Sequence, residues 1–261
     1  KSLKLGKFEF TDPDFSLATQ FDFLTFITKL FPMSYDTVYP EGMPMIYCGT
    51  AVLILVPLFF MNDRITMKEK TSTGLLTFLL VILMYIKPAD MAMHGFQVPN
   101  WLPYRYSFIF SFLMIVMACR AFDNLEGITA KNIGGIFFGL MVFLFWCERE
   151  NYSHFQLFET KTSETGDTTN VIQGIWVSMI ALAAYFALIN LIKKYPKSKA
   201  VCIVMVGVLA VELFANSADT IDKIDTDVAY SKYTSYEPYM TQTRNAVSMM
   251  KEYDPSLFYR M

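Results

Sequence analysis

Charged residues are missing from six long stretches of the chain, and these stretches predict its membrane-spanning helices. Five of them contain no Asp, Glu, Lys or Arg, and the sixth contains only Glu212. A span needs about 20 predominantly apolar residues. Three stretches reach that length and three are shorter, but compact polar loops separate all six. We expect an all-α, polytopic membrane helical bundle of about six transmembrane helices, at 45–61, 72–86, 106–121, 132–147, 171–192 and 200–216.

A different pattern precedes the first predicted span. Over residues 15–31, apolar side chains such as Leu17, Phe21 and Leu24 recur near helical spacing, with polar residues between them. This segment is too short and too polar to span, so it predicts an amphipathic helix in the membrane interface. We therefore divide the chain into an external loop with the interfacial helix (1–44), a transmembrane bundle (45–216) and the start of an extracytoplasmic region (217–261).

Composition agrees with a membrane location and argues against several functions. Apolar residues make up 54% of the chain, and the net charge of −2 lacks the basic footprint of a nucleic-acid-binding protein. The four cysteines lie within or beside apolar runs without a CxxC pair, so we predict neither a disulfide framework nor a zinc site. The fingerprints GxxxxGK[ST], GxSxG and HExxH are absent. The chain begins without Met, and we expect it to be a piece of a longer membrane protein.

The predicted loops differ in their basic residues, and this difference orients the bundle. Loops one, three and five carry nine Lys and Arg residues, whereas the longer loops two and four carry four. Cytoplasmic loops are enriched in Lys and Arg, so the odd-numbered loops are predicted to be cytoplasmic. The interfacial helix, loops two and four and the C-terminal tail then all face outside. This orientation gathers the unusual polar groups of the chain on one face.

The second predicted loop contains the motif HGFQVPNWLPYRYSF, which starts at His94. Pro99 and Pro103 remove backbone donors, so the segment cannot be a regular helix before Arg105. Trp and Tyr prefer the headgroup level of a membrane, and an arginine offers a planar fork suited to phosphate. We therefore predict that this loop binds a lipid-linked phosphate through Arg105, His94, Tyr104, Trp101 and Asn100.

Each of these residues also has a structural interpretation. A loop histidine such as His94 serves structure as readily as proton transfer, and Asn100 can be a turn residue. Arg105 could snorkel from a helix end, although its aromatic neighbours favour phosphate binding. Asp90, just before the motif, could act as an acid or a base, and the alternative is a carboxylate solvated in a loop.

A second polar group begins at the outer end of the fourth predicted span. Its carboxylates, arginine and histidine could bind a sugar or a divalent cation, but their spacing matches no metal-site pattern, so we expect no metal ion and no other cofactor. Glu212 lies near the external end of the sixth span, where an ionisable group indicates function; pairing with an arginine across the bundle is the alternative. We predict a sugar or acceptor cleft lined by Glu148, Arg149, Glu150, His154, Asp90 and Glu212.

Two strings of residues carry a resemblance to a known family. HGFQVPNWLPYRYSFIFSF, with SYDTVYPEGMPMIYCGTAVLILVPLFFMN ahead of it, resembles the bacterial YfhO family of polytopic membrane proteins, over most of residues 20–261. That family is similar to the GT-C glycosyltransferases, which take sugar from a polyprenyl phosphate carrier outside the cytoplasm. YfhO members are associated with glycosylation of lipoteichoic acid or related surface polymers in Gram-positive bacteria.

The resemblance implies part of a membrane glycosyltransferase with a GT-C-like fold, located in the cell membrane with its functional face outside. Its partners would be membrane lipid, a polyprenyl-phosphate sugar and a surface-polymer acceptor, and no nucleic acid. GT-C enzymes usually place an acidic catalytic residue in the first external loop, which implies that the catalytic acid or base lies upstream of this chain. A transporter or flippase of lipid-linked sugars, or a non-catalytic membrane scaffold, is the alternative.

Overall fold

The computed structural model describes residues 16–97, 99, 101–151, 170–228 and 233–253. The described residues are mostly helical and contain no strand beyond a single bridge between Thr19 and Ile86. Their helices are α1 (Phe23–Thr28), α2 (Thr50–Met61), α3 (Met67–Tyr85), α4 (Lys87–Met93), α5 (Ser107–Asp123), α6 (Ala130–Asn151), α7 (Asn170–Lys194), α8 (Lys199–Asp227) and α9 (Tyr233–Tyr253). The chain forms two compact units, Lys1–Lys223 and Ile224–Met261.

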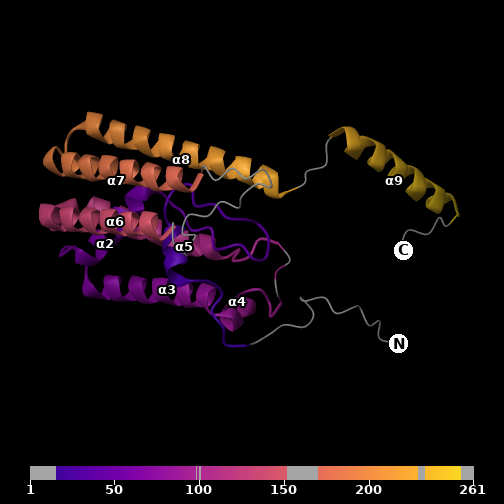
Figure 1. Cartoon of the computed structure of the whole chain (residues 1–261), viewed down its shortest axis with the longest axis horizontal. Coiled ribbons are helices and arrows are strands. Elements are labelled where there is room, and N and C mark those ends of the chain that lie inside the picture. The colour runs from indigo at the N-terminus through magenta and orange to yellow at the C-terminus, as the bar shows by residue number, and fades with distance from the viewer. Residues whose placement is uncertain (1–15, 98, 100, 152–169, 229–232, 254–261) are drawn as a thin grey trace. The chain divides into compact units, whose positions relative to one another are not determined.

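Each of the six predicted spans overlaps one helix. These helices are α2, α3, α5, α6, α7 and α8, and the axes of α3, α6, α7 and α8 run roughly parallel (Figure 1). Among the described residues, three helical segments are long and apolar enough to cross a membrane, namely Ala130–Arg149, Gly174–Lys194 and Lys199–Asp225. Thr50–Met61 is apolar but shorter. The predicted all-α membrane bundle is therefore confirmed, while the number of crossings stays a prediction.

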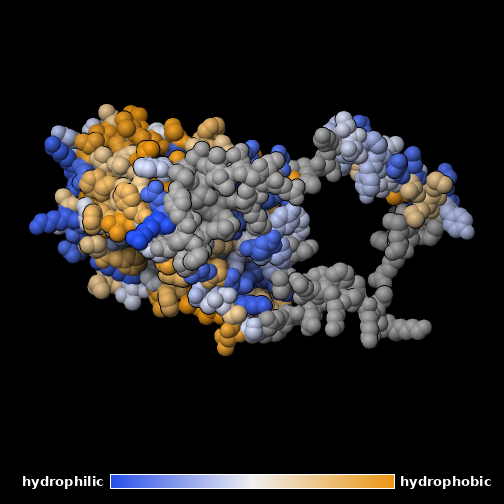
Figure 2. Space-filling view, viewed as in Figure 1, coloured by the Kyte–Doolittle hydropathy of each residue, from blue (hydrophilic) through white to orange (hydrophobic). Residues whose placement is uncertain are grey.

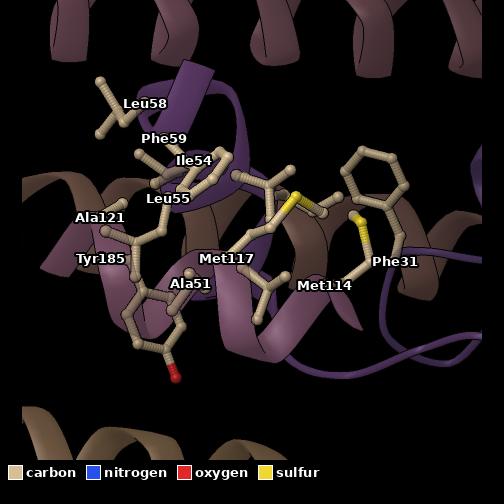
Figure 3. Close-up of a cluster of buried hydrophobic side chains, with 14 of the residues drawn as sticks. Phe31, Ala51, Ile54, Leu55, Leu58, Phe59, Met114, Met117, Ala121 and Tyr185 are labelled. Atoms are coloured by element: carbon tan, nitrogen blue, oxygen red, sulfur yellow. The ribbon is translucent and has the colours of Figure 1, made fainter. Parts of the chain in front are cut away.

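Helix α2 forms the centre of the bundle. It packs against α5, α6 and α7, and nine of its twelve residues are buried. A helix that is apolar on all sides belongs inside a core. Figure 3 shows Leu55 and Phe59 of α2 in one cluster with Met117 of α5 and Tyr185 of α7. The shortest of the six bundle helices is thus the best buried.

Large apolar side chains cover much of the outside of the bundle. Phe78 of α3, Phe112 of α5, Phe138 of α6 and Phe214 of α8 are all exposed. The space-filling view shows such residues gathered over the helical bundle (Figure 2). An extended apolar surface of this kind marks contact with a membrane or with other protein. The outer surface therefore agrees with the membrane location predicted from the sequence.

The predicted interfacial helix is shorter than expected. The Asp22 carboxylate accepts from the backbone N–H groups of Leu24 (2.9 Å) and Thr25 (3.2 Å), so it starts a helix at residue 23. Helix α1 is only six residues long, and Phe26 is buried in the bundle core. The expected helix over 15–31 was wrong in length, because an N-cap aspartate interrupts the apolar spacing.

The first predicted span also begins later than expected. Gly49 has a φ of 105°, which side-chain-bearing residues rarely adopt, and α2 starts at the next residue. The carbonyls of Met45 and Ile46 accept from the hydroxyls of Ser107 and Ser111 on α5, each at 3.2 Å. Non-helical backbone at membrane depth needs such partners. At the other end of the chain, α8 continues eleven residues beyond the predicted limit at 216.

Candidate functional site

The chain makes a series of tight turns between α4 and α5. His94 ends α4, and four residues then have φ between 53° and 68°: Gly95, Phe96, Leu102 and Tyr104. Three of them carry side chains, for which this left-handed backbone is uncommon. Strain of this kind gathers at functional sites, where surrounding contacts hold it in place. The non-helical segment predicted from the two prolines is confirmed.

The segment before α2 holds these turns in position. The Leu102 N–H donates to the Val38 carbonyl at 2.8 Å. The rings of Tyr39 and Trp101 are 5.0 Å apart between centroids. These contacts join two loops that lie more than 60 residues apart in the sequence. The Trp101 indole is therefore partly exposed and contacts the Tyr39 ring.

Arg105 lies at the surface of the same turn. Its guanidinium donates to the carbonyls of Trp101 (2.9 Å) and Leu102 (3.3 Å). Two of the five N–H groups of an arginine are used in this way, and the residue is exposed. The side chain is therefore fixed by its own turn, with the rest of its fork available to an anion.

Asp90 is buried in α4, only 4% exposed, so its interpretation as a solvated loop carboxylate is wrong. Its Oδ2 accepts from the Gln20 side-chain amide at 2.8 Å, and its Oδ1 lies 2.7 Å from the Tyr106 hydroxyl. The same hydroxyl lies 2.8 Å from the Leu83 carbonyl. The His94 Nε2 lies 3.5 Å from Oδ1 and, among the described buried side-chain atoms, is the one without a hydrogen bond.

The hydrogen-bond geometry favours a neutral Asp90. The Tyr106 hydroxyl has one proton but two oxygen neighbours, Asp90 Oδ1 and the Leu83 carbonyl. A protonated Asp90 can donate to Tyr106, which then donates to Leu83, and both contacts are satisfied. Burial raises the pKa of Asp90, against the opposing effects of Tyr106, His94 and Gln20. Asp90 can therefore act as a proton donor in this part of the molecule.

Tyr104 belongs with Asp90 rather than at the surface. Its ring is buried and meets the edge of Phe21, with centroids 5.9 Å apart. Both Tyr104 and Asp90 line a small pocket of about 60 Å³, together with Pro99 and Lys87. Burial raises the pKa of Tyr104, so it stays a neutral hydroxyl. Of the five predicted phosphate-binding residues, Trp101 and Arg105 share one turn, and Tyr104 and His94 each lie near Asp90. Asn100 lies outside the described residues.

Glu212 of α8 meets the beginning of α2. Its Oε1 accepts from the Tyr47 hydroxyl (2.5 Å), the Thr50 N–H (2.9 Å) and the Thr50 hydroxyl, and its Oε2 accepts from Tyr185 of α7. Gly49, the N-cap residue, has no side chain for this purpose. A carboxylate is stabilised at a helix N-terminus. The partners of Glu212 are hydroxyls and a helix end, where the alternative interpretation expected an arginine.

No hydrogen bond or ion pair joins the described residues of the predicted sugar or acceptor cleft to one another, and the cleft stays a prediction. Glu148 is half-buried and Arg149 is exposed near the end of α6, and neither has a hydrogen bond or ion pair with the described residues around Asp90 or Glu212. The Glu150 side chain and all of His154 lie outside what the structure describes. Within the described residues, no three His, Cys, Asp or Glu side chains are grouped to hold a metal ion.

Several partners in these two networks were not predicted from the sequence. Gln20, Tyr47 and Tyr185 come from three different segments, and only the fold brings them to Asp90 and Glu212. Tyr106 gave a usable signal, because it directly follows Arg105 in the aromatic motif. Tyr185 gave a weaker one, as a hydroxyl within an apolar span that has to find a partner.

These features define a polytopic helical membrane protein with a polar end built from tight turns and hydrogen-bonded carboxylates. A sequence model of the family described as "Bacterial membrane protein YfhO" matches residues 2–261, so the chain belongs to this family. The resemblance seen in the sequence motifs is thereby confirmed. Comparison with curated proteins and with solved structures found no match.

Proposed function

We propose that the chain is part of a membrane glycosyltransferase that transfers sugar from a polyprenyl-phosphate carrier to a cell-surface polymer such as lipoteichoic acid. The observation that carries the proposal is the Trp101–Arg105 turn. It presents a guanidinium, fixed by two backbone carbonyls, in the same turn as a partly exposed indole. Indole rings prefer the headgroup level of a bilayer, where the phosphate of a lipid carrier also lies.

In the proposed reaction, a hydroxyl of the acceptor attacks the anomeric carbon of the donor sugar. A new glycosidic C–O bond forms while the bond between that carbon and the phosphate oxygen breaks. The lipid phosphate leaves with the bonding electrons, and the acceptor proton passes to a general base. The exchange is redox-neutral, so the proposal names no redox or organic cofactor.

Arg105 would stabilise the departing phosphate. The charge on the leaving oxygen grows in the transition state, and a fixed donor aimed at it lowers the barrier. Because the Arg105 fork is already held by Trp101 and Leu102, little ordering is needed during the reaction. Asp90, whose pKa is raised by burial, would supply a proton donor behind this turn. Glu148 and Arg149 remain candidates for binding the acceptor.

Replacement of Arg105 tests this proposal. In membranes containing the full-length protein, Arg105→Ala should lower sugar transfer by about a hundredfold, the usual loss for one transition-state donor. Arg105→Lys should retain part of the activity, because it keeps the charge and loses the fork. Arg64→Ala is a matched control, since Arg64 is an exposed arginine paired with Glu126 in another loop. Undiminished transfer by Arg105→Ala would remove this residue from the mechanism.

The beginning of α2 favours a second candidate, a transporter or flippase of lipid-linked sugars. Transporters place discontinuous helices at their substrate sites, and α2 is a twelve-residue helix preceded by extended chain and capped by Glu212. A transferase needs substrate access from one side of the membrane, whereas a transporter needs access from both. Movement of labelled lipid-linked sugar across vesicles, without transfer to an acceptor, would favour this second candidate.

A further inference from the structure

A separate pocket of about 150 Å³ lies where the chain between α1 and α2 meets α8. Its wall includes Lys29, Asp36 and Tyr47 from the N-terminal side and Asn216 and Thr220 from α8. A water molecule needs about 10–15 Å³ of such space, so the pocket has room for a molecule of several waters' size. None of these residues except Tyr47 takes part in the networks around Asp90 and Glu212.

The charges in this pocket balance each other. Lys29 is only 5% exposed, and its ammonium donates to the Ser34 carbonyl (3.1 Å) and lies 4.0 Å from the Asp36 carboxylate. Asp36 also accepts from the Met43 N–H at 3.1 Å. A phosphate would be repelled by Asp36, and a divalent cation would be repelled by Lys29 and find a single carboxylate. The pocket is therefore suited to a neutral, polar ligand.

The remaining polar groups are arranged to bind hydroxyls. The hydroxyls of Tyr47 and Thr220 use their protons on Glu212 and on the Asn216 carbonyl, so each offers lone pairs as acceptors. The Asn216 side-chain oxygen accepts from the Met33 N–H (2.8 Å), which fixes its amide N–H groups as donors. The pocket therefore offers both hydrogen-bond acceptors and donors around the Lys29–Asp36 pair, whose charges cancel. This combination matches the several hydroxyls of a sugar ring.

The same loop connects this pocket to the Trp101–Arg105 turn. Residues at both ends of the loop line the pocket, whereas Val38 and Tyr39 in its middle contact Leu102 and Trp101. We propose that the pocket binds one neutral hexose ring, belonging to the donor or to the acceptor, beside the phosphate-binding turn. This inference rests on the proposed function for the source of the sugar, but its binding chemistry stands on the pocket itself.

Direct binding of simple sugars tests the pocket independently of transfer. The full-length protein in lipid nanodiscs is titrated with methyl hexosides of the glucose, galactose and mannose series, and binding is followed by saturation-transfer NMR. At least one hexoside should bind, and inorganic phosphate should not compete with it. Asp36→Asn and Thr220→Val should weaken binding about tenfold or more, the usual effect of removing one hydrogen bond to a ligand. Thr220→Val keeps the shape of the side chain, and the exposed Asp63→Asn serves as the control.

The outcomes separate this inference from the proposed function. Equal hexoside binding by wild type, Asp36→Asn and Thr220→Val would overturn the pocket, even where Arg105→Ala abolishes transfer. A second outcome is that the wild type binds a hexoside but transfers no sugar, and that both variants lose this binding. This result would support the pocket and exclude the transferase function. Where the wild type transfers sugar, the KM values of the two variants identify the ligand. A KM for the lipid-linked donor above that of the wild type assigns the pocket to the donor, and a raised KM for the polymer assigns it to the acceptor. Absence of hexoside binding by the wild type would also overturn the inference.

Discussion

At the scale of single residues, Asp90 is the group whose behaviour depends most on its surroundings. It is buried among Gln20, Tyr106 and His94, and Lys87 lines the pocket beside it. Desolvation disfavours the carboxylate form and raises the pKa of Asp90, whereas the hydrogen bonds and His94 act in the opposite direction. Burial has the largest effect, so the pKa of Asp90 lies above its ordinary value, at a position where a solvated carboxylate is the ordinary expectation.

Asp90→Asn should become more stable relative to wild type as the pH rises. Because the pKa of Asp90 is raised on folding, its contribution to stability is complete below the ordinary aspartate pKa of about 3.9 and is lost as the pH rises through the folded-state value. An amide cannot ionise, and it can donate to Tyr106 while accepting from Gln20. Thermal unfolding of the purified full-length protein in mild detergent, measured from pH 4 to pH 8, checks this. The exposed Asp222→Asn should change little, and parallel pH curves for Asp90→Asn and wild type would contradict the prediction.

At the scale of the elements, the short central helix α2 depends on its neighbours for backbone hydrogen bonds. The extended residues before it cannot satisfy their own carbonyls, and two serine hydroxyls of α5 do so. Glu212 of α8 supplies the missing cap at the Thr50 N–H. The chain can therefore leave the helical conformation at this depth, which brings Tyr47 to Glu212 and to the pocket.

Removing both serine hydroxyls should destabilise the bundle measurably. The double variant Ser107→Ala and Ser111→Ala leaves the carbonyls of Met45 and Ile46 without these partners. Each unsatisfied buried polar group costs about 1–3 kcal/mol, so the free energy of unfolding should fall by at least about 2 kcal/mol. Denaturant unfolding in mixed micelles measures it.

Ser178→Ala is the matched control for this prediction. Ser178 is fully buried in α7, and its hydroxyl donates to the Gly174 carbonyl of its own helix. Loss of that hydroxyl leaves helical backbone that keeps its regular hydrogen bonds. A double serine variant no less stable than Ser178→Ala would show that the extended segment finds other partners.

At the scale of the whole first unit, the antiparallel helices separate the connecting loops into two groups. At one end, Arg64 pairs with Glu126 at 3.2 Å, and the Asn62 side chain donates to the Asn124 carbonyl at 2.9 Å. These residues belong to predicted loops one and three. The networks around Asp90 and Glu212 lie at the starts of α5 and α2, which is the opposite end of both helices.

Cysteine labelling should find these two ends on opposite sides of the membrane. In full-length protein without its native cysteines, Gln97→Cys should react with an impermeant maleimide in intact cells. Glu126→Cys should react only after permeabilisation, because the basic loops are predicted to be cytoplasmic. Both side chains are exposed, so reagent access to the folded protein does not decide the result. The reverse pattern would place the phosphate-binding turn in the cytoplasm and rule out an external transferase.

The residues that were predicted correctly share one property, a dependence on local sequence. The apolar stretches placed all six helices of the bundle, and the two prolines placed the turns before α5, because helix formation and its interruption are decided within a few residues. The family resemblance also came from contiguous strings of residues. The predicted length of α1 was wrong, because the sequence alone does not show whether Asp22 lies on a face of a helix or caps its start.

The sequence by itself determined an all-helical membrane protein of the YfhO family, with an arginine and aromatic residues in a turn between two helices. Tertiary structure alone decided that Asp90 is buried beside Gln20, that Glu212 caps α2, and that Lys29 and Asp36 share a pocket with Asn216. The physical reason is distance along the chain. Hydrophobic periodicity reports each helix separately, whereas a binding pocket depends on which side chains from distant segments are packed together.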